Sequence, residues 1–158
     1  GISQGAVRAD IAVINGCLTA FEIKSYRDTL DRLPHQAAAY GRVFDYITLV
    51  VGKKHALGIS KQIPRCWGVV VVSEEDGCLR LDTRKPARQN NKTDPVAVAE
   101  LLWRDEALAL LSERGLDRGL RSKPRRHLWT ALADNLPAAE LAECVRHALR
   151  TRADWRSG

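Results

Sequence analysis

The sequence predicts an α/β protein, with a sheet and its helices in residues 1–93 and an all-helical segment in residues 94–158. In the first part, short apolar runs of strand length alternate with helical patterns, and this interleaving is typical of α/β domains. After residue 93 the apolar residues keep helical spacing only. A chain of 158 residues is also long enough to bury a core without disulfides.

The composition is that of an ordinary folded protein with a modest positive charge. Apolar residues make up 45% of the chain, charged residues 28%, and the formal net charge is +6. This balance argues against disorder and suits a nucleic-acid partner. No uncharged apolar run approaches the roughly 20 residues that span a bilayer. The four cysteines are scattered, which indicates free thiols and a cytoplasmic protein.

Two strands are expected at the beginning, over residues 7–14 and 18–24. Asn15-Gly16 between them is a strong hairpin signal. Both faces of these strands are mostly apolar. We therefore expect the sheet to be covered on both sides.

The remaining elements follow from turn and capping residues. Pro34 suits the first position of a helix over 35–44, and a β-branched strand follows over 46–51. A helix over 53–63 ends at Pro64, and strands over 67–73 and 79–83 enclose the turn Glu75-Asp76-Gly77.

Three helices are expected after a polar linker over residues 85–93. Asp94 and Pro95 are an N-cap and a first helical residue. The helix they begin keeps its apolar spacing as far as Gly115, which is expected to end it because glycine adopts the left-handed conformation at helix ends. Two more helices are expected over 122–136 and 137–152.

The first hairpin carries the chemistry-bearing pattern. Asp10 stands on its first strand, and Glu22 and Lys24 share one face of its second strand. Neighbouring carboxylates repel, and a divalent cation removes that cost because hard cations take oxygen ligands. Asp10, Glu22 and the backbone carbonyl of Ile23 are therefore the candidate metal ligands. Lys24 would lie beside the metal, where it orients or deprotonates a water and offsets phosphate charge.

The register of this hairpin decides whether the carboxylates meet. A two-residue Asn15-Gly16 turn pairs Ile14 with Cys17 and sends Asp10 and Glu22 to opposite faces. A three-residue loop that includes Cys17, or a single bulge, pairs Asp10 with Glu22 instead. With the first register, both carboxylates are ordinary surface charges on an edge hairpin.

A second motif follows on the helix expected over 35–44, where Gln36 and Tyr40 lie one turn apart. Together with Asp10 and the Glu22-Ile23-Lys24 strand, this order resembles the PD-(D/E)XK nuclease superfamily, and within it the RecB-type members with a Q-x-x-x-Y helix. The catalytic motifs cover residues 8–40. Likeness to an uncharacterised bacterial group of such proteins covers nearly the whole chain.

The resemblance implies a restriction-endonuclease-like mixed sheet flanked by helices over 1–93, with a helical extension over 94–158. It implies metal-dependent hydrolysis of phosphodiester bonds, with DNA as the expected substrate and Mg²⁺ or Mn²⁺ as the cofactor. Asp10 and Glu22 become metal ligands and Lys24 the catalytic lysine. Gln36 and Tyr40 become the helix residues that position the site or the nucleic-acid backbone.

The sequence departs from the superfamily pattern in two places. Ala9 precedes Asp10 where proline is usual. Such nucleases also carry an acidic residue on an N-terminal helix, which nothing before Val7 supplies, so we expect a fragment. An alternative is a non-catalytic nucleic-acid-binding module on the same fold. A third is a structural protein with these carboxylates on its surface.

A basic stretch in the helical half is the second candidate contact with nucleic acid. It contains one acid, Asp117, among six cations, and several of the cations fall in the first turn of an expected helix. The helix dipole disfavours cations there, whereas a phosphate bound at that helix start would reverse the cost. The alternative is a solvated charged surface. The candidate nucleic-acid-binding residues are Arg8, Arg121, Lys123, Arg125 and Arg126.

Overall fold

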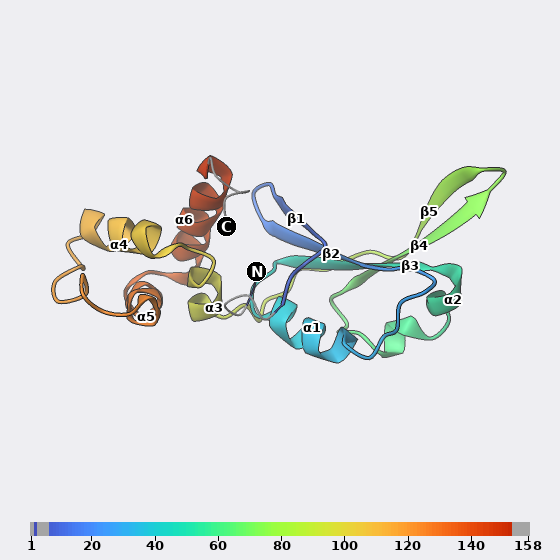
Figure 1. The fold of residues 1–158 in the computed structure, drawn as a ribbon, viewed down its shortest axis with the longest axis horizontal. Coiled ribbons are helices and arrows are strands. Elements are labelled where there is room, and N and C mark those ends of the chain that lie inside the picture. Colours follow the sequence, from blue (N-terminus) through green and yellow to red (C-terminus); the bar gives the residue numbers. More distant parts are fainter. Residues whose placement is uncertain (1, 3–6, 153–158) are drawn as a thin grey trace.

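The computed structural model describes residue 2 and residues 7–152, and it contains a five-stranded mixed sheet followed by helices (Figure 1). The strand order follows the chain, with β1 and β5 at the edges. Strands β2, β3 and β4 are parallel, and each edge strand is antiparallel to its neighbour. The strands are β1 Ile11–Ile14, β2 Leu18–Lys24, β3 Tyr46–Gly52, β4 Gly68–Glu75 and β5 Cys78–Lys85.

Helical connections join the parallel strands. Helix α1, Leu33–Gly41, links β2 to β3 and has Pro34 in its first turn, as the sequence predicts. The helix expected over 53–63 is divided into α2, Lys53–Ala56, and the 3₁₀ turn η2, Ile59–Lys61. The division falls at Gly58, whose φ of +76° no α-helix allows.

Only one face of the sheet is covered by these helices. Figure 1 shows α1 and α2 on the same side, which is the expected result when successive parallel crossovers share one handedness. The side chains on this face are at most 7% exposed: Leu18, Ala20, Glu22, Lys24, Ile47, Leu49, Val51, Val69 and Val71. On the other face, five apolar side chains are 42–76% exposed: Ile11, Val13, Ile23, Leu79 and Leu81. The expectation of cover on both sides is therefore wrong for the described residues.

Both hairpins turn where the sequence predicts. In the first, Ile14 pairs with Leu18 across a three-residue loop, and Gly16 supplies the left-handed conformation with φ +67°. In the second, Glu75 pairs with Cys78 across the two-residue turn Asp76-Gly77, where both residues have positive φ. This is the geometry of a type I′ turn, for which Asp-Gly is a preferred sequence.

The segment after the sheet consists of helices, as predicted, but its first helix is broken. Trp103 has an extended backbone conformation, with ψ 160°, and therefore lies outside the helix. Its N–H donates to Glu106 Oε2 at 2.7 Å. This local cap starts a new helix and outweighs the continuous apolar spacing around it. The helices are α3 Pro95–Ala99, α4 Arg104–Glu113, α5 Arg125–Asn135 and α6 Ala138–Thr151. Within the described chain no helix is long and apolar enough to cross a membrane.

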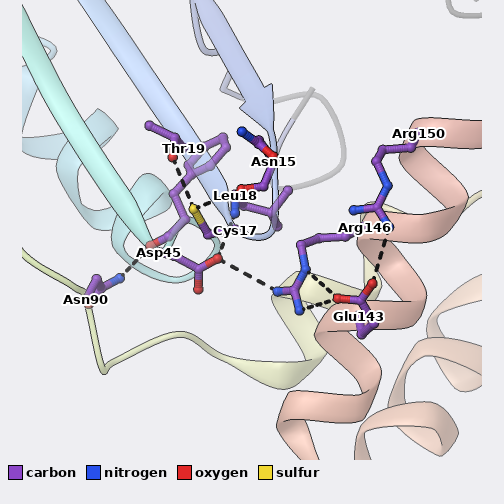
Figure 2. A network of polar contacts seen from close by, with 10 residues as sticks. Asn15, Cys17, Leu18, Thr19, Asp45, Asn90, Glu143, Arg146 and Arg150 are labelled. Carbon is purple, nitrogen blue, oxygen red and sulfur yellow. Dashed lines mark hydrogen bonds and ion pairs between the residues drawn. The ribbon is translucent and has the colours of Figure 1, made fainter.

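Polar contacts join the helical segment to the sheet at the amino ends of β2 and β3 (Figure 2). Asp45 Oδ2 accepts a hydrogen bond from the Leu18 amide at 2.7 Å, and it lies 4.0 Å from the Arg146 guanidinium on α6. Arg146 also donates to Glu143 at 2.7 Å. The linker is anchored at the same junction by Asn90, whose amide N–H donates to the Asp45 carbonyl.

Candidate active site

The centre of the candidate site is a buried ion pair on β2. Glu22 and Lys24 alternate onto the helix-covered face, where they are only 2% and 7% exposed. The Lys24 ammonium donates to Glu22 Oε1 at 2.7 Å. Charges this deeply buried are retained only when they are paired and hydrogen-bonded, because desolvation of an isolated charge is costly.

Helix α1 supplies two further donors to the same carboxylate. Gln36 Nε2 donates to Glu22 Oε1 at 2.5 Å, and the Tyr40 hydroxyl lies 2.6 Å from Oε2. The hydroxyl also lies 2.9 Å from the Arg8 carbonyl. The one-turn spacing of Gln36 and Tyr40 places both above Glu22, as the sequence predicts.

Tyr40 is fixed by packing as well as by hydrogen bonding. Its ring is fully buried, stacks on Trp67 with centroids 5.9 Å apart, and meets Phe44 edge-on. Burial, followed by the hydrogen bond to the Glu22 carboxylate, raises the pKa of the Tyr40 phenol well above its ordinary value of 10. The hydroxyl is therefore protonated at neutral pH and acts as a hydrogen-bond donor.

Asp10 lies beside this cluster. The first hairpin has the three-residue loop that the nuclease-like interpretation requires. The paired residues end at Ile11 and Phe21, and Asp10 stands directly before Ile11, at the end of this pairing. The exposed carboxylate of Asp10 accepts a hydrogen bond from the Ile23 amide at 2.8 Å through Oδ2. Its charge also contributes to the raised pKa of the Tyr40 phenol. The alternative two-residue turn does not occur.

The oxygen atoms at this place are chemically suited to a hard cation. Glu22 Oε2 meets one donor and has a second lone pair, and Asp10 accepts its backbone bond through one oxygen. The Gln36 Oε1 atom is buried and meets no hydrogen-bond donor in the described structure. Mg²⁺ prefers carboxylate, amide and carbonyl oxygens, so these donors fit it. In residues 7–152 no group of three or more His, Cys, Asp or Glu side chains is placed to hold a metal.

The predicted nucleic-acid-binding residues do not form one surface with this site. Arg8 precedes Asp10 and is exposed beside it. The other four lie in or next to the connection from α4 to α5, at the far end of the molecule from α2 (Figure 1). Arg121 pairs there with Asp117 at 2.8 Å, and the Arg125 guanidinium lies 5.3 Å from the Trp129 ring centroid.

Sequence patterns missed two features near this site and its support. Asn90, expected in a polar linker, is buried and donates through its side chain to the Gly41 and Phe44 carbonyls. It thereby satisfies carbonyls at the end of α1. Tyr26 and Lys54 lie together just beyond the ends of β2 and β3. The one sequence signal for the Tyr26–Lys54 contact is the Gly52-Lys53-Lys54 run directly after a strand.

Comparisons with known proteins give one family. The family described as Bacteriophage P4 protein cII matches residues 2–157. Protein cII of Enterobacteria phage P4 is 28% identical over 151 residues, which is 96% of this chain and 56% of that protein. The chain thus spans little more than half the length of this curated relative. No solved structure matches. The family match covers nearly the whole sequence, and the chain belongs to the bacteriophage P4 protein cII family.

Proposed function

We propose that this chain carries a metal-dependent nuclease site that hydrolyses phosphodiester bonds in DNA. The observation that carries the proposal is the buried Glu22 carboxylate, which accepts hydrogen bonds from Lys24, Gln36 and Tyr40, with Asp10 bonded to the neighbouring Ile23 amide. A buried charged pair with its own hydrogen-bond network is expensive to maintain, and such groups concentrate at functional sites. This arrangement also supports membership in the PD-(D/E)XK superfamily and a restriction-endonuclease-like fold.

Each residue has a separate role in this proposal. Lys24 places a positive charge next to the Glu22 carboxylate, where it would stabilise the negative charge that develops on a phosphate under attack by water. Gln36 and Tyr40 hold Glu22 in one orientation. Arg8, whose carbonyl contacts the Tyr40 hydroxyl, would bind the neighbouring phosphate through its exposed side chain.

Asp10, Glu22 and the Ile23 carbonyl would hold Mg²⁺ or Mn²⁺. The metal would supply charge neutralisation and a bound water of lowered pKa. The Gln36 Oε1 atom, buried without a donor in the described structure, gives the site one more oxygen.

A second candidate is a non-catalytic nucleic-acid-binding module. Two observations favour it: Lys24 already neutralises Glu22, and the described residues provide two carboxylates and no larger ligand group. The basic connection before α5 would then be the main contact. For this candidate, Arg125→Ala with Arg126→Ala should weaken DNA affinity and flatten its salt dependence, because phosphate contacts release counterions.

Cleavage of labelled DNA in Mg²⁺ tests the proposal. We expect Glu22→Gln and Lys24→Ala each to slow cleavage by about 100-fold or more, because Glu22 would hold the metal and Lys24 would stabilise the charge on the reacting phosphate. DNA affinity measured in EDTA should stay near that of the parent. Matched controls are Glu113→Gln on α4 and Lys92→Ala in the linker, both at exposed positions, which should cleave at the parent rate.

Three results would contradict the nuclease proposal. Cleavage that survives EDTA would point to other chemistry or to contamination. A Lys24→Ala protein that cuts as fast as the parent would remove the catalytic assignment. DNA binding without cleavage in either metal would leave the binding module as the function.

A further inference from the structure

An exposed aromatic side chain stands at the end of the strand that carries Glu22 and Lys24. Tyr26 is 70% exposed, two residues beyond Lys24. Single exposed apolar residues are common on protein surfaces, so exposure alone decides nothing. What distinguishes Tyr26 is that its backbone and its ring are both held in place.

A tight turn fixes the backbone of this segment. The Ser25 amide donates to Asp28 Oδ2 at 2.7 Å, and the Asp28 amide donates back to the Ser25 carbonyl at 3.2 Å. The Ser25 bonds, and more weakly the charges of Lys24 and His55, hold the pKa of the Asp28 carboxyl below its ordinary range. The turn therefore lies close to Lys24 and to α2.

A lysine from the next crossover fixes the ring. Lys54 Nζ donates to the Tyr26 carbonyl at 3.1 Å and lies over the ring, 4.8 Å from its centroid. A cation over one face of an aromatic ring is attracted by its quadrupole. Because the residue is still 70% exposed, the opposite ring face remains open to solvent.

The charge around Tyr26 is mainly positive. Arg27 is the next residue and Lys54 contacts the ring, and both side chains are exposed. The acid nearest in sequence, Asp28, is engaged by the Ser25 turn. An aromatic ring among cations is the combination with which proteins bind unpaired nucleotides, because the ring stacks on a base and the cations bind phosphates.

We propose that Tyr26, Lys54 and Arg27 form a binding platform for single-stranded nucleic acid, with an unpaired base stacked on the open face of Tyr26. The strand is single because a duplex buries the faces of its bases against one another, leaving none for an isolated protein ring. The proposal rests on the proposed function for its purpose, which is to bring the strand to Lys24 and Glu22.

Binding measured in EDTA tests the platform without any cleavage. The probes are fluorescently labelled oligothymidylate, oligouridylate and a DNA duplex of equal length. We expect Tyr26→Ala to weaken oligothymidylate binding about tenfold or more, the usual effect of removing one stacked base contact. Tyr26→Phe should keep the parent affinity within about twofold, since the ring makes the contact. Duplex binding should change much less.

Trp103→Ala is the matched control. Trp103 is also an exposed aromatic with a cation over it, the Arg152 guanidinium at 4.1 Å, but it belongs to the helical segment at the other end of the molecule (Figure 1). Its loss should leave oligothymidylate affinity unchanged. Thermal melts of each variant check that it folds.

The outcomes separate this inference from the nuclease proposal. A Tyr26→Ala effect no larger than that of Trp103→Ala, or equal losses on single strand and duplex, overturns the platform even if the protein cleaves DNA. A parent that binds neither oligonucleotide also overturns it. Single-strand binding that depends on Tyr26, without cleavage in Mg²⁺, supports the platform and overturns the nuclease. Tyr26→Ala should weaken oligouridylate binding as well, because every base presents a face that can stack on the ring.

Discussion

The Tyr40 hydroxyl shows how one atom ties the strand carrying the candidate site to its helix. It lies within hydrogen-bond distance of the Glu22 carboxylate and of the Arg8 carbonyl. The side chains of Tyr40 and Glu22 are both buried. Its raised pKa keeps the proton available for donation across the neutral range. A buried carboxylate that loses one of its donors cannot replace it with water at no cost.

Tyr40→Phe should therefore destabilise the protein while preserving its packing. We expect a loss of about 1–3 kcal/mol, because the variant leaves the Glu22 Oε2 atom without this donor. Urea unfolding followed by circular dichroism gives the free energy of unfolding. Tyr26→Phe is the control, since it removes a hydroxyl from an exposed ring. Equal stability of the two variants would mean that the Tyr40 bond contributes nothing.

At the residue scale, sequence reasoning could place most of the site. The alternation of β2 and the one-turn spacing of Gln36 and Tyr40 determine which side chains meet at Glu22. The position of Asp10 depended on a choice between two turn lengths, which local sequence leaves open. Asn90 could not be foreseen, because burial of a polar linker residue depends on contacts made by distant parts of the chain.

At the scale of an element, the start of α3 is determined by Asp94. One oxygen of its side chain accepts from the Val96 and Ala97 amides, and the other accepts from Arg42 at 2.7 Å. The Arg42 bond, with the two amides, lowers the pKa of the Asp94 carboxyl from its ordinary value of 3.8. Asp94 thus caps a helix and also links it to the end of α1.

Substitutions at Asp94 should separate these two roles. Asp94→Ala should cost about 1 kcal/mol through the lost cap. Asp94→Asn keeps a capping oxygen and loses only a half-exposed ion pair, so its cost should stay below about 1 kcal/mol. Asp82→Ala is the control, because Asp82 pairs with Arg84 on β5 and caps no helix. Chemical denaturation of the three variants measures these differences.

The pH dependence follows from the direction of the pKa shift. A carboxyl whose pKa is lower in the folded state stabilises the fold above the unfolded value, near 3.8, and loses that contribution as the pH falls through the folded value. The stability gap between the parent and Asp94→Asn should be present at neutral pH and shrink as the pH falls from the unfolded value of 3.8 through the lower folded value. A gap that persists at lower pH would contradict the charge contribution.

Helices and strands with strong local sequence signals were predictable, whereas the positions at which helices are interrupted were not. The bounds of β2 match the expected strand, and both turn sequences produce hairpins. The division of two expected helices into shorter ones was not predicted, because apolar spacing continues across each break. Gly58 and the Trp103 cap interrupt the backbone without interrupting the pattern of side chains.

At the scale of the molecule, the candidate site and the attachment of the helical segment lie at opposite ends of the strands. The carboxyl ends of β2 and β3 carry Lys24 and the proposed Tyr26 platform, whereas Asp45 at the amino end of β3 contacts the helical segment. The site and α1 share the covered face. The helical segment can therefore be altered at its outer surface without disturbing Glu22.

Because helices cover only one face of the sheet, the same Val→Ala substitution should have different effects on stability on the two faces. Val71 on β4 is 5% exposed on the covered face, and Val13 on β1 is 42% exposed on the other. Val71→Ala removes two buried methyl groups and leaves a cavity, which should cost about 2 kcal/mol. Val13→Ala removes methyl groups that already contact water, so its cost should be less than half of that.

Urea unfolding of both variants, with parallel m-values, decides between this arrangement and a sheet covered on both sides. Unchanged m-values would show that the variants differ in stability and not in the surface exposed on unfolding. Equal costs at Val13 and Val71 would mean that something in solution covers the outer face as closely as α1 and α2 cover the inner one. Repeating the Val13→Ala measurement across protein concentrations would then show whether a second copy provides that cover, because stability that comes from association rises with concentration.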